Sequence, residues 1–515
     1  MKRLSASFLP PISLDRAKGH PVYRQLYDWF QRAIASGQLR PGQRVPSTRA
    51  LATELNLSRI PVLTAFEQLL AEGYLETFHG AGTCVASSIP QETIGPAPGQ
   101  SLRKIGQASQ RKGTRKISPG SRAVKSLAGQ AWLKLSGAFR MHLPALDHFP
   151  MEIWSRLVAR NIRKGEKSLM AYGDVMGYAP FREAIAEYLG AVRAVRCDPS
   201  QVMVTTGSQQ GLQISASVLL DPEAPVWMEE PGYPGAHQAF ATVGVRLIPV
   251  PVDGEGLNVA EGIRRCPKAR AVYITPSHQY PMGMTMSATR RMQLLNWASR
   301  AGAWIIEDDY DSEYRFGIRP IGSLQGLDSD ARVIYIGTFS KVMFPALRLG
   351  YLVIPEDLVR MFSVIREATD IFSSMLYQAV MTDFIKEGHF ARHVRRMRGL
   401  YTERCRALEE SLRAEMGRLM EVVSADAGMH LVGLLPSNFH DVAVSQKAAQ
   451  SGISAMPLSN CYLKRPSRPG LVLGYGPTDR AQIQDGVRTL SKILRSAPES
   501  TAPESARHIH NRFSE

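Results

Sequence analysis

No aspartate or glutamate occurs between Thr93 and Leu146 of this 515-residue chain. The stretch carries 10 lysines and arginines, so it supplies 10 of the 16 net positive charges, and it is rich in Gly, Ser, Pro and Gln. Such a composition is typical of a flexible basic linker, which we place at residues 88–134. Two folded parts are therefore expected, one on each side of it, in agreement with a length that exceeds a single-core size.

The two flanking parts are nearly neutral and have no pattern of metal ligands. Residues 1–92 carry 10 basic and 7 acidic side chains, and residues 147–515 carry 42 and 39. The five cysteines are scattered, with no CxxC pair and no histidine at ligand spacing. No targeting segment and no run of transmembrane length are found. We expect a cytoplasmic protein without a structural metal, a disulfide framework or a membrane span.

Residues 13–87 show the pattern of three helices followed by two strands. Four apolar residues recur at helical spacing in the first helix: Val22, Leu26, Phe30 and Ile34. Ser47 and Ser58 are typical N-caps of two further helices, the second of which ends at Gly73. Two short helices joined by a tight turn form a helix-turn-helix, whose second helix can enter the major groove of DNA. Residues 74–85 then have the pattern of a two-stranded wing.

This order resembles the winged helix-turn-helix of the GntR regulators. The resemblance rests on Pro46-Ser47-x-Arg49-x-Leu51-Ala52, on Ser58-Arg59 and on the wing sequence Gly80-Ala81-Gly82-Thr83. It implies a double-stranded DNA operator as partner. The DNA-binding residues that it implies are Arg44, Ser47, Arg49, Ser58, Arg59 and Gly82. The last of these would let the wing approach a phosphate closely.

Two positions depart from the GntR pattern and bear on the operator sequence. Pro61 takes an early position of the second helix of the motif, where the family has a polar residue, and Phe78 replaces a wing arginine. Pro61 leaves the helix intact, because a first-turn N–H has no partner within the helix.

The alternative to a DNA-binding role for residues 13–87 is a three-helix protein-protein module with exposed arginines. Beside a DNA reader the basic linker would add nonspecific attraction to phosphates, unless its charge only keeps the spacer extended.

In the second part, Lys341 stands in a pattern that differs from that of a surface lysine. It follows the apolar run Val333–Ile336, comes just after the hydroxyl residues Thr338 and Ser340, and precedes Arg348 by seven residues. The acidic run Glu307–Asp311 comes about thirty residues earlier. A desolvated lysine near a second cation has a depressed pKa, so that its amine can attack an aldehyde. The spacing is typical of a pyridoxal phosphate site, where such a lysine forms a Schiff base. The alternative, a solvated surface charge, lacks these neighbours.

From about Leu135 the motifs follow an order that resembles the aminotransferases of pyridoxal phosphate fold type I, over roughly 350 residues. The resemblance implies an α/β fold for residues 135–496, after an α+β winged helix at residues 13–87; residues 497–515 are expected to be a disordered tail. Gly207-Ser208-Gln209 follows a strand at 202–206 and opens a helix, which makes a ready phosphate cradle. An acidic run that ends a buried parallel strand lies where ligands bind.

The resemblance implies a role for each cofactor-binding residue. Asp308 would bond the pyridine nitrogen and keep it protonated, Tyr310 and His278 the 3-hydroxyl, and Tyr233 would stack on the ring. Thr338, Ser340 and Arg348 would reach the phosphate, and Tyr172 would reach that of a neighbouring subunit in a homodimer. The full set is Tyr172, Gly207, Ser208, Gln209, Tyr233, His278, Asp308, Tyr310, Thr338, Ser340, Lys341 and Arg348, with Lys341 as the Schiff-base residue.

A late strand, Gly470–Tyr475, departs from the family at its start. Transaminases of this fold place an arginine there to hold the substrate carboxylate, whereas this chain has Gly470, with Arg468 two residues away as a possible substitute. Without a fixed guanidinium an amino acid loses its orientation for proton transfer. Ligands are then expected to bind and react slowly.

A GntR winged helix joined to such a domain resembles the MocR subfamily of bacterial transcriptional regulators. The function that this implies is a regulator, not a turnover enzyme, that senses pyridoxal phosphate, or an amine or amino acid bound to it as an external aldimine. The first alternative is a working aminotransferase with an accessory DNA-binding domain. The second is an architectural nucleic-acid protein with a degenerate enzyme domain, which requires that no pyridoxal phosphate binds.

Overall fold

A computed structural model of the chain describes residues 9–14, 20–78, 82–87, 121, 124, 127, 136–316, 322–424, 426–464 and 466–496. Its contacts divide the chain into two units, residues 1–116 and 117–515. Apart from three isolated residues, the expected linker at 88–134 lies outside the described residues, as does the expected tail. The domain limits 13–87 and 135–496 stay predictions.

The amino-terminal unit contains the three helices and the wing predicted from the sequence. Helices α1 (Val22–Ala35), α2 (Thr48–Glu54) and α3 (Arg59–Ala71) precede the antiparallel strands β1 (Leu75–Phe78) and β2 (Gly82–Val85). The apolar face of each helix is buried in one core, which contains Leu26, Phe30, Leu51, Val62 and Phe66.

The two predicted caps behave differently. Ser47 is the N-cap of α2, and its hydroxyl accepts a hydrogen bond from the Ala50 N–H at 3.2 Å. Ser58 occupies the N-cap position of α3, but its side chain makes no capping hydrogen bond, which corrects the expectation. The exposed Ser58 hydroxyl therefore does not serve to hold the helix start.

The second unit is built on an eight-stranded, mostly parallel sheet with strand order β3-β10-β9-β8-β7-β4-β5-β6. Strand β10 is antiparallel to both of its neighbours, and β6 is antiparallel to β5. In chain order the elements are α6 (Met151–Lys164), α7 (Ala179–Arg193), β3 (Val202–Thr205), α8 (Ser208–Leu219), β4 (Pro225–Glu230), α9 (Pro234–Thr242), β5 (Arg246–Asp253), β6 (Gly256–Leu257), α10 (Val259–Arg265), β7 (Ala271–Ile274), α11 (Ala288–Ala301), β8 (Trp304–Asp309), β9 (Val333–Thr338), β10 (Gly350–Val353), α12 (Val359–Thr369) and α13 (Met375–Lys386).

Side chains of alternate strand residues are buried on opposite faces of this sheet, as the pleat requires. On β9, Ile334 and Ile336 belong to a cluster with residues of α8, α9 and α12, whereas Tyr335 packs with residues of α7, α13 and α14 (His389–Met416). Because both faces are covered, the strands are continuous apolar runs and only their ends carry polar groups. These ends position the site.

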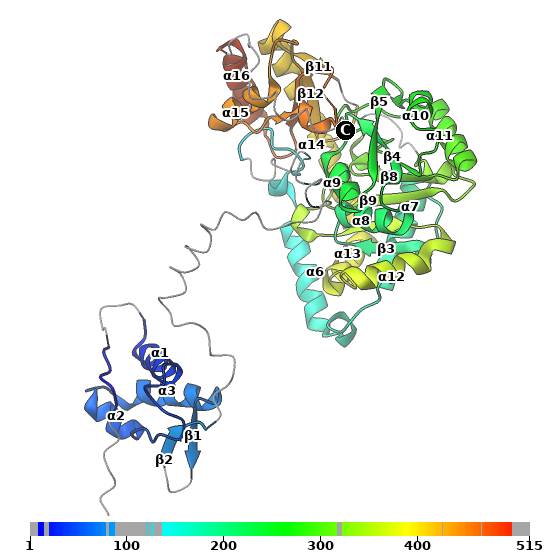
Figure 1. Cartoon of the computed structure of the whole chain (residues 1–515). Helices are drawn as coiled ribbons and strands as arrows, with labels where there is room; N and C mark the ends of the chain where they lie inside the picture. Colours follow the sequence, from blue (N-terminus) through cyan, green and yellow to red (C-terminus); the bar gives the residue numbers. More distant parts are fainter. Residues whose placement is uncertain are drawn as a thin grey trace, which may run out of the picture. The chain divides into compact units, whose positions relative to one another are not determined.

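A smaller sheet follows in the chain. Strands β11 (Glu421–Val423), β12 (His430–Leu434), β13 (Met456–Pro457) and β14 (Gly470–Gly474) pair in the order β11-β12-β14-β13. Helix α15 (Asp441–Gln450) packs against β13 and β14, and α16 (Arg480–Ser496) packs against α14 and α15. Figure 1 shows this group apart from the helices around the large sheet.

An ion pair at the end of β8 is expected to stabilise the second unit. Arg193 Nε lies 2.7 Å from Asp309 Oδ2, and both side chains are 3% exposed. Replacing Arg193 with Met leaves the carboxylate buried without its cation, so we expect the free energy of unfolding to fall by about 3–5 kcal/mol.

Thermal and denaturant unfolding of the full chain measures this loss. The matched control is Arg264→Met, because Arg264 pairs with Glu261 with its side chain 71% exposed; its effect should stay within about 0.5 kcal/mol. Equal unfolding curves for the two variants would contradict the prediction.

Candidate functional site

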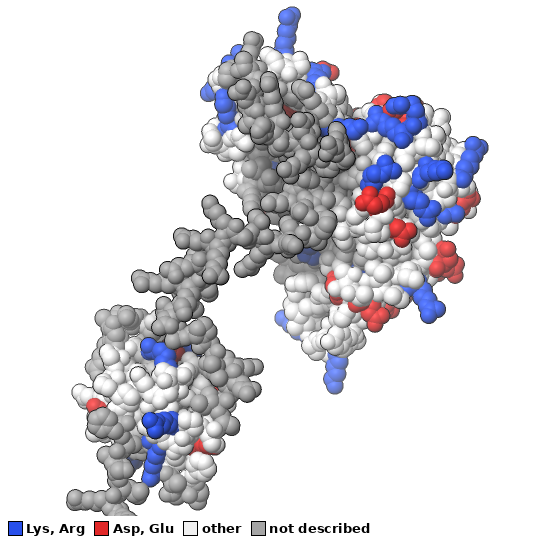
Figure 2. Space-filling model, viewed as in Figure 1, with Lys and Arg blue, Asp and Glu red and all other residues white. Residues whose placement is uncertain are grey.

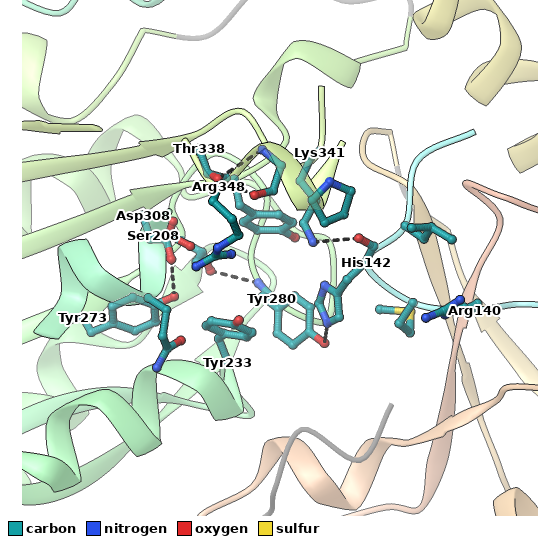
Figure 3. A pocket seen from close by; sticks show the side chains of 17 residues that line it. Arg140, His142, Ser208, Tyr233, Tyr273, Tyr280, Asp308, Thr338, Lys341 and Arg348 are labelled. Atoms are coloured by element: carbon teal, nitrogen blue, oxygen red, sulfur yellow. Dashed lines mark hydrogen bonds between the residues drawn. The ribbon is translucent and has the colours of Figure 1, made fainter. Parts of the chain in front are cut away.

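A cavity of about 330 Å³ lies at the carboxyl ends of β7, β8 and β9 and at the start of α8. Figure 3 shows the side chains that surround it. The lining residues are Arg140, Met141, His142, Leu143, Ser208, Gln209, Tyr233, Tyr273, Thr275, Tyr280, Asp308, Tyr310, Thr338, Ser340, Lys341, Pro345 and Arg348. Nine of these were predicted from the sequence: Ser208, Gln209, Tyr233, Asp308, Tyr310, Thr338, Ser340, Lys341 and Arg348.

Lys341 carries the only side-chain amine in this lining. Its Nζ donates a hydrogen bond to the carbonyl oxygen of His142 at 3.3 Å. Burial lowers the pKa of Lys341 to about 8, and the anions of Asp311 and Asp308 offset part of this effect. The uncharged amine, which can act as a nucleophile, is therefore far more populated near neutral pH than in an ordinary lysine.

The pleat of β8 decides which acid of the acidic run faces the cavity. Asp308 lines it, whereas Glu307 and Asp309 serve the structure: Glu307 accepts the backbone N–H groups of Leu324 and Gln325, and Asp309 pairs with Arg193. Such alternation follows from the period of two along a strand.

Only one of the two carboxylate oxygens of Asp308 has a hydrogen-bond partner among the described residues. Its Oδ2 accepts a hydrogen bond from the Tyr273 hydroxyl at 2.9 Å, but its buried Oδ1 has no partner there. Burial raises the pKa of Asp308 to about 7. A buried oxygen without a partner is costly, so this position favours a ligand that carries an N–H group.

An anion cradle forms one side of the cavity. The N-terminus of α8 begins at Ser208, and its N-cap Gly207 has φ 114°, a conformation that L side chains rarely adopt. A Cβ at Gly207 would also lie 3.3 Å from the Arg348 guanidinium. Thr338 donates a hydrogen bond to Ser340 at 3.1 Å nearby. Backbone N–H groups, hydroxyls and a guanidinium together suit a phosphate.

Three tyrosines form the aromatic wall. The rings of Tyr233 and Tyr280 meet edge to face with centroids 5.3 Å apart, and Tyr280 also stacks on His142 at 5.5 Å. The hydroxyl of Tyr310 lies 2.8 Å from Nδ1 of His278. Burial raises the pKa of Tyr233 and of Tyr310, so both hydroxyls keep their protons.

His278 itself lies outside the cavity lining, so its direct bond to the 3-hydroxyl of the cofactor stays a prediction. Its Nδ1 is 2.9 Å from Asp311 Oδ1, and the missing side chain of Gly428 leaves room for the ring, since a Cβ there would lie 2.1 Å from His278 Cε1. The residue of this loop that reaches the cavity is Tyr280, two positions later. The loop sequence, which contains both His278 and Tyr280, does not indicate which of the two side chains turns toward the cavity.

Two other predicted residues lie outside the lining. Gly207 contributes only as the N-cap beneath Arg348. Tyr172 is 86% exposed, and its ring meets Phe372 at 6.1 Å instead of the cavity of its own chain. An intrachain role for Tyr172 is thus excluded by its position.

The segment 139–143, which no sequence pattern predicted as part of the site, lines the cavity beside Lys341 with residues 140–143. Phe139 and His142 both have positive φ, 66° and 63°, and Gly474 of β14 lets the segment approach closely, since a Cβ there would lie 2.4 Å from the Arg140 carbonyl oxygen. His142 Nε2 lies 3.1 Å from the Tyr280 hydroxyl. Strained residues held by their surroundings are typical of functional sites, but no periodicity in the sequence reveals them.

Strand β14 brings no cation to the cavity. Gly470 pairs with Leu434, and Arg468 donates to the Leu435 carbonyl and pairs with Glu421, so neither lines it. Val472 packs instead in a cluster with Met141 and Tyr280. The substitution of Arg468 for a carboxylate clamp, considered from the sequence, is therefore not supported.

The predicted DNA-binding residues lie at the surface of the amino-terminal unit. Arg44, Arg49 and Arg59 are exposed, and on the face shown in Figure 2 arginines and a few acidic side chains stand among mostly uncharged residues. Gly82 has a role not foreseen from the sequence: a Cβ there would lie 3.0 Å from the Arg44 guanidinium, so its absence lets Arg44 rest on the wing.

Two family descriptions match this chain. Residues 22–85 match the bacterial regulatory proteins of the gntR family, and residues 149–471 match aminotransferase class I and II. The protein therefore consists of a GntR winged helix-turn-helix and an aminotransferase domain of fold type I, as predicted. The family also implies pyridoxal phosphate as the cofactor of the second unit.

Full-length relatives identify the family more closely. The chain is 38% identical over 498 residues, 95% of its length and 97% of the relative, to the probable rhizopine catabolism regulatory protein MocR of Rhizobium meliloti. It is 30% identical over 494 residues, 93% and 98% of the two lengths, to the pyridoxine biosynthesis transcriptional regulator PdxR of Corynebacterium glutamicum. The chain belongs to the MocR-type transcriptional regulators.

A solved structure supports the assignment of the second unit. It is the α-aminoadipate aminotransferase LysN of Thermus thermophilus in complex with N-(5'-phosphopyridoxyl)-L-leucine, with a TM-score of 0.69 and 31% identity. The match covers 74% of this chain and 97% of LysN. Among the residues that the structure describes, no helix is long and apolar enough to cross a membrane.

The lowered pKa of Lys341 predicts a pH profile. The amine attacks an aldehyde only when uncharged, so the rate at which cofactor-free protein captures pyridoxal phosphate should rise with pH and level off above about pH 8, well below the ordinary value of 10.5. Stopped-flow absorbance measures this rate. The Lys341→Ala variant should show no such phase, and a midpoint near pH 10.5 would contradict the burial argument.

Proposed function

We propose that this protein is a pyridoxal phosphate-dependent DNA-binding regulator whose second unit senses the cofactor, or an amine or amino acid held on it. The observation that supports this most is a buried lysine of lowered pKa beside an anion cradle, in the same chain as a winged helix with exposed arginines. Neither feature alone distinguishes a regulator from an aminotransferase or from a plain DNA-binding protein.

The residues of the cavity fit pyridoxal phosphate in their chemistry. Lys341 would supply the amine for covalent attachment, and the unpartnered Asp308 Oδ1 would accept the pyridine N–H. The phosphate would lie in the cradle of Ser208, Gln209, Thr338, Ser340 and Arg348, at the helix start that Gly207 opens. When bound, the cofactor supplies an aldehyde for primary amines and an electron-withdrawing ring.

The protein's own groups would orient what binds. Tyr233 would cover the ring, and Tyr310 would bond the 3-hydroxyl with Tyr280 beside it, while His278 positions Tyr310 through Nδ1. The carbonyl of His142 holds the Lys341 amine within the cavity. Tight walls of tyrosine and the 139–143 segment would exclude water from the amine.

We further propose a homodimer. Large apolar side chains are exposed on α6, on the turn Lys167–Leu169 and the residues after it, and on α13: Met151 (60%), Ile162 (59%), Met170 (78%), Tyr172 (86%) and Tyr377 (42%). Helix α13 contacts both α6 and the turn Lys167–Leu169, and a second copy would bury these exposed side chains. In that arrangement Tyr172 would reach the phosphate of the neighbouring subunit.

Regulation requires that the ligand binds two arrangements of the protein with unequal affinity. The named functions of the relatives fit this proposal, since MocR and PdxR are regulatory proteins and LysN holds a phosphopyridoxyl amino acid. Binding to an operator also suits a cytoplasmic location.

The proposed DNA contacts predict a measurable loss. Replacing Arg59 with Ala should weaken binding to the selected operator by roughly 1–3 kcal/mol and relax its specificity if Arg59 meets a base edge. If Arg49 or Arg59 meets only phosphate, its Ala variant should weaken binding to all duplexes alike and flatten the salt dependence. Fluorescence anisotropy over a range of salt concentrations separates the two, with Arg264→Ala on α10 as control. Unchanged affinity in both Arg49→Ala and Arg59→Ala would overturn the DNA-binding assignment.

Covalent attachment tests the second unit. Borohydride reduction of the holoprotein followed by peptide mapping should place the pyridoxyl group on Lys341, and Lys341→Ala should remain colourless. Lys386→Ala, which changes the lysine on α13 that pairs with Glu183, is the control and should keep the adduct on Lys341.

The same preparation tests regulator against enzyme, because a cavity without a carboxylate clamp from β14 should bind amines yet turn over negligibly. Keto-product formation with a panel of amino donors and a keto-acid acceptor measures this. Sustained turnover of about 1 per second or faster would support the aminotransferase alternative.

A further inference from the structure

Two large apolar side chains are exposed at the start of α3, the second helix of the helix-turn-helix. Ile60 is 74% exposed and Leu63 is 39% exposed. They are three positions apart, so they share one face of the helix. The core side of α3 is filled by other residues, Val62, Ala65, Phe66 and Leu69, all of which are buried. The exposed pair is therefore not required for folding of the unit.

The same face offers few hydrogen-bonding groups. Pro61 has no N–H, and the Thr64 hydroxyl donates to the Ile60 carbonyl at 3.1 Å. Among the side chains of residues 58–64, only Ser58 and Arg59 carry polar groups that are not engaged within the helix. A helix with this surface would contact the base edges in a DNA groove mainly through apolar side chains and through the guanidinium of Arg59.

Charge favours DNA over a protein as the occupant of this face. Arg59 precedes Ile60 directly, Arg49 lies on α2, and Arg44 rests on the wing at Gly82; all three are exposed. None of the three forms an ion pair within the described part of this unit. An apolar pair among unpaired arginines suits the major groove, because phosphates lie on either side of the base edges.

The apolar group that base edges present in the major groove is the 5-methyl of thymine. We propose that Ile60 and Leu63 recognise thymine methyl groups, so that the operator contains thymines at fixed positions opposite the start of α3. Three helical residues span about 4.5 Å, so the two side chains would reach neighbouring base pairs. This inference rests on the proposed DNA-binding function and adds the base class that the helix selects.

The first step of the test finds the DNA. Full-length holoprotein selects duplexes from a random pool, and selected positions should include at least one fixed thymine. If no duplex is selected, the DNA-binding function fails together with this inference. If duplexes are selected without any fixed thymine, only the inference fails.

The second step removes the methyl group alone. Each fixed thymine is replaced by deoxyuridine, which keeps the same hydrogen bonds. We expect affinity to fall about 3- to 10-fold at each contacted position, because one buried methyl group is lost. The affinity for the thymine duplex is divided by the affinity for the uracil duplex. In Ile60→Ala or Leu63→Ala this ratio should fall toward one at the base position that the replaced side chain contacts.

Ile263→Ala is the matched control, since Ile263 is an exposed apolar residue of the second unit, 42% exposed on α10. Its ratio of thymine to uracil affinity should equal that of the wild type. Both tested residues are exposed, so unchanged thermal unfolding of the variants should confirm that they fold. Equal binding of thymine and uracil duplexes by the wild type would overturn the proposal and assign the apolar pair to a protein contact.

Discussion

Burial of Lys341 and Asp308 at one edge of the large sheet is the constraint on which the second unit depends. Desolvation disfavours both charges, so it lowers the pKa of Lys341 to about 8 and raises that of Asp308 to about 7. The sheet can hold them there because its strands are covered on both faces and leave polar groups only at their ends. The N-terminus of helix α8 and the guanidinium of Arg348 favour an anion. They form the anion cradle, which is distinct from the Asp308 carboxylate.

Close backbone approaches keep this arrangement rigid. Gly474 admits the segment 139–143, Gly428 admits the ring of His278, and Gly207 lies beneath the Arg348 guanidinium. In each case a Cβ would collide with or crowd a group that shapes the cavity. A glycine also makes room for a neighbouring side chain in the amino-terminal unit, where Gly82 leaves space for Arg44 on the wing.

One chain thus combines two binding surfaces of different chemistry. The residues of the cavity suit pyridoxal phosphate in their chemistry, whereas the helix-turn-helix carries exposed arginines and an exposed apolar pair, which we propose contact DNA. Strand β14 brings no cation to the cavity, so the α-carboxylate of a bound amino acid would find no guanidinium on that strand. A ligand that binds and persists is suited to act as a signal.

The sequence by itself determined the two units, the helix-turn-helix and wing, and nine of the cavity residues, because these depend on local periodicity, capping residues and the order of strand ends. It predicted Asp308 as the cavity acid, and the pleat of β8 accounts for that choice. Only the tertiary structure placed Tyr280 instead of His278 in the wall, brought residues 139–143 to the cavity and set Arg44 on Gly82. These depend on loop conformations with positive φ and on contacts between residues far apart in the chain, which local sequence patterns do not encode.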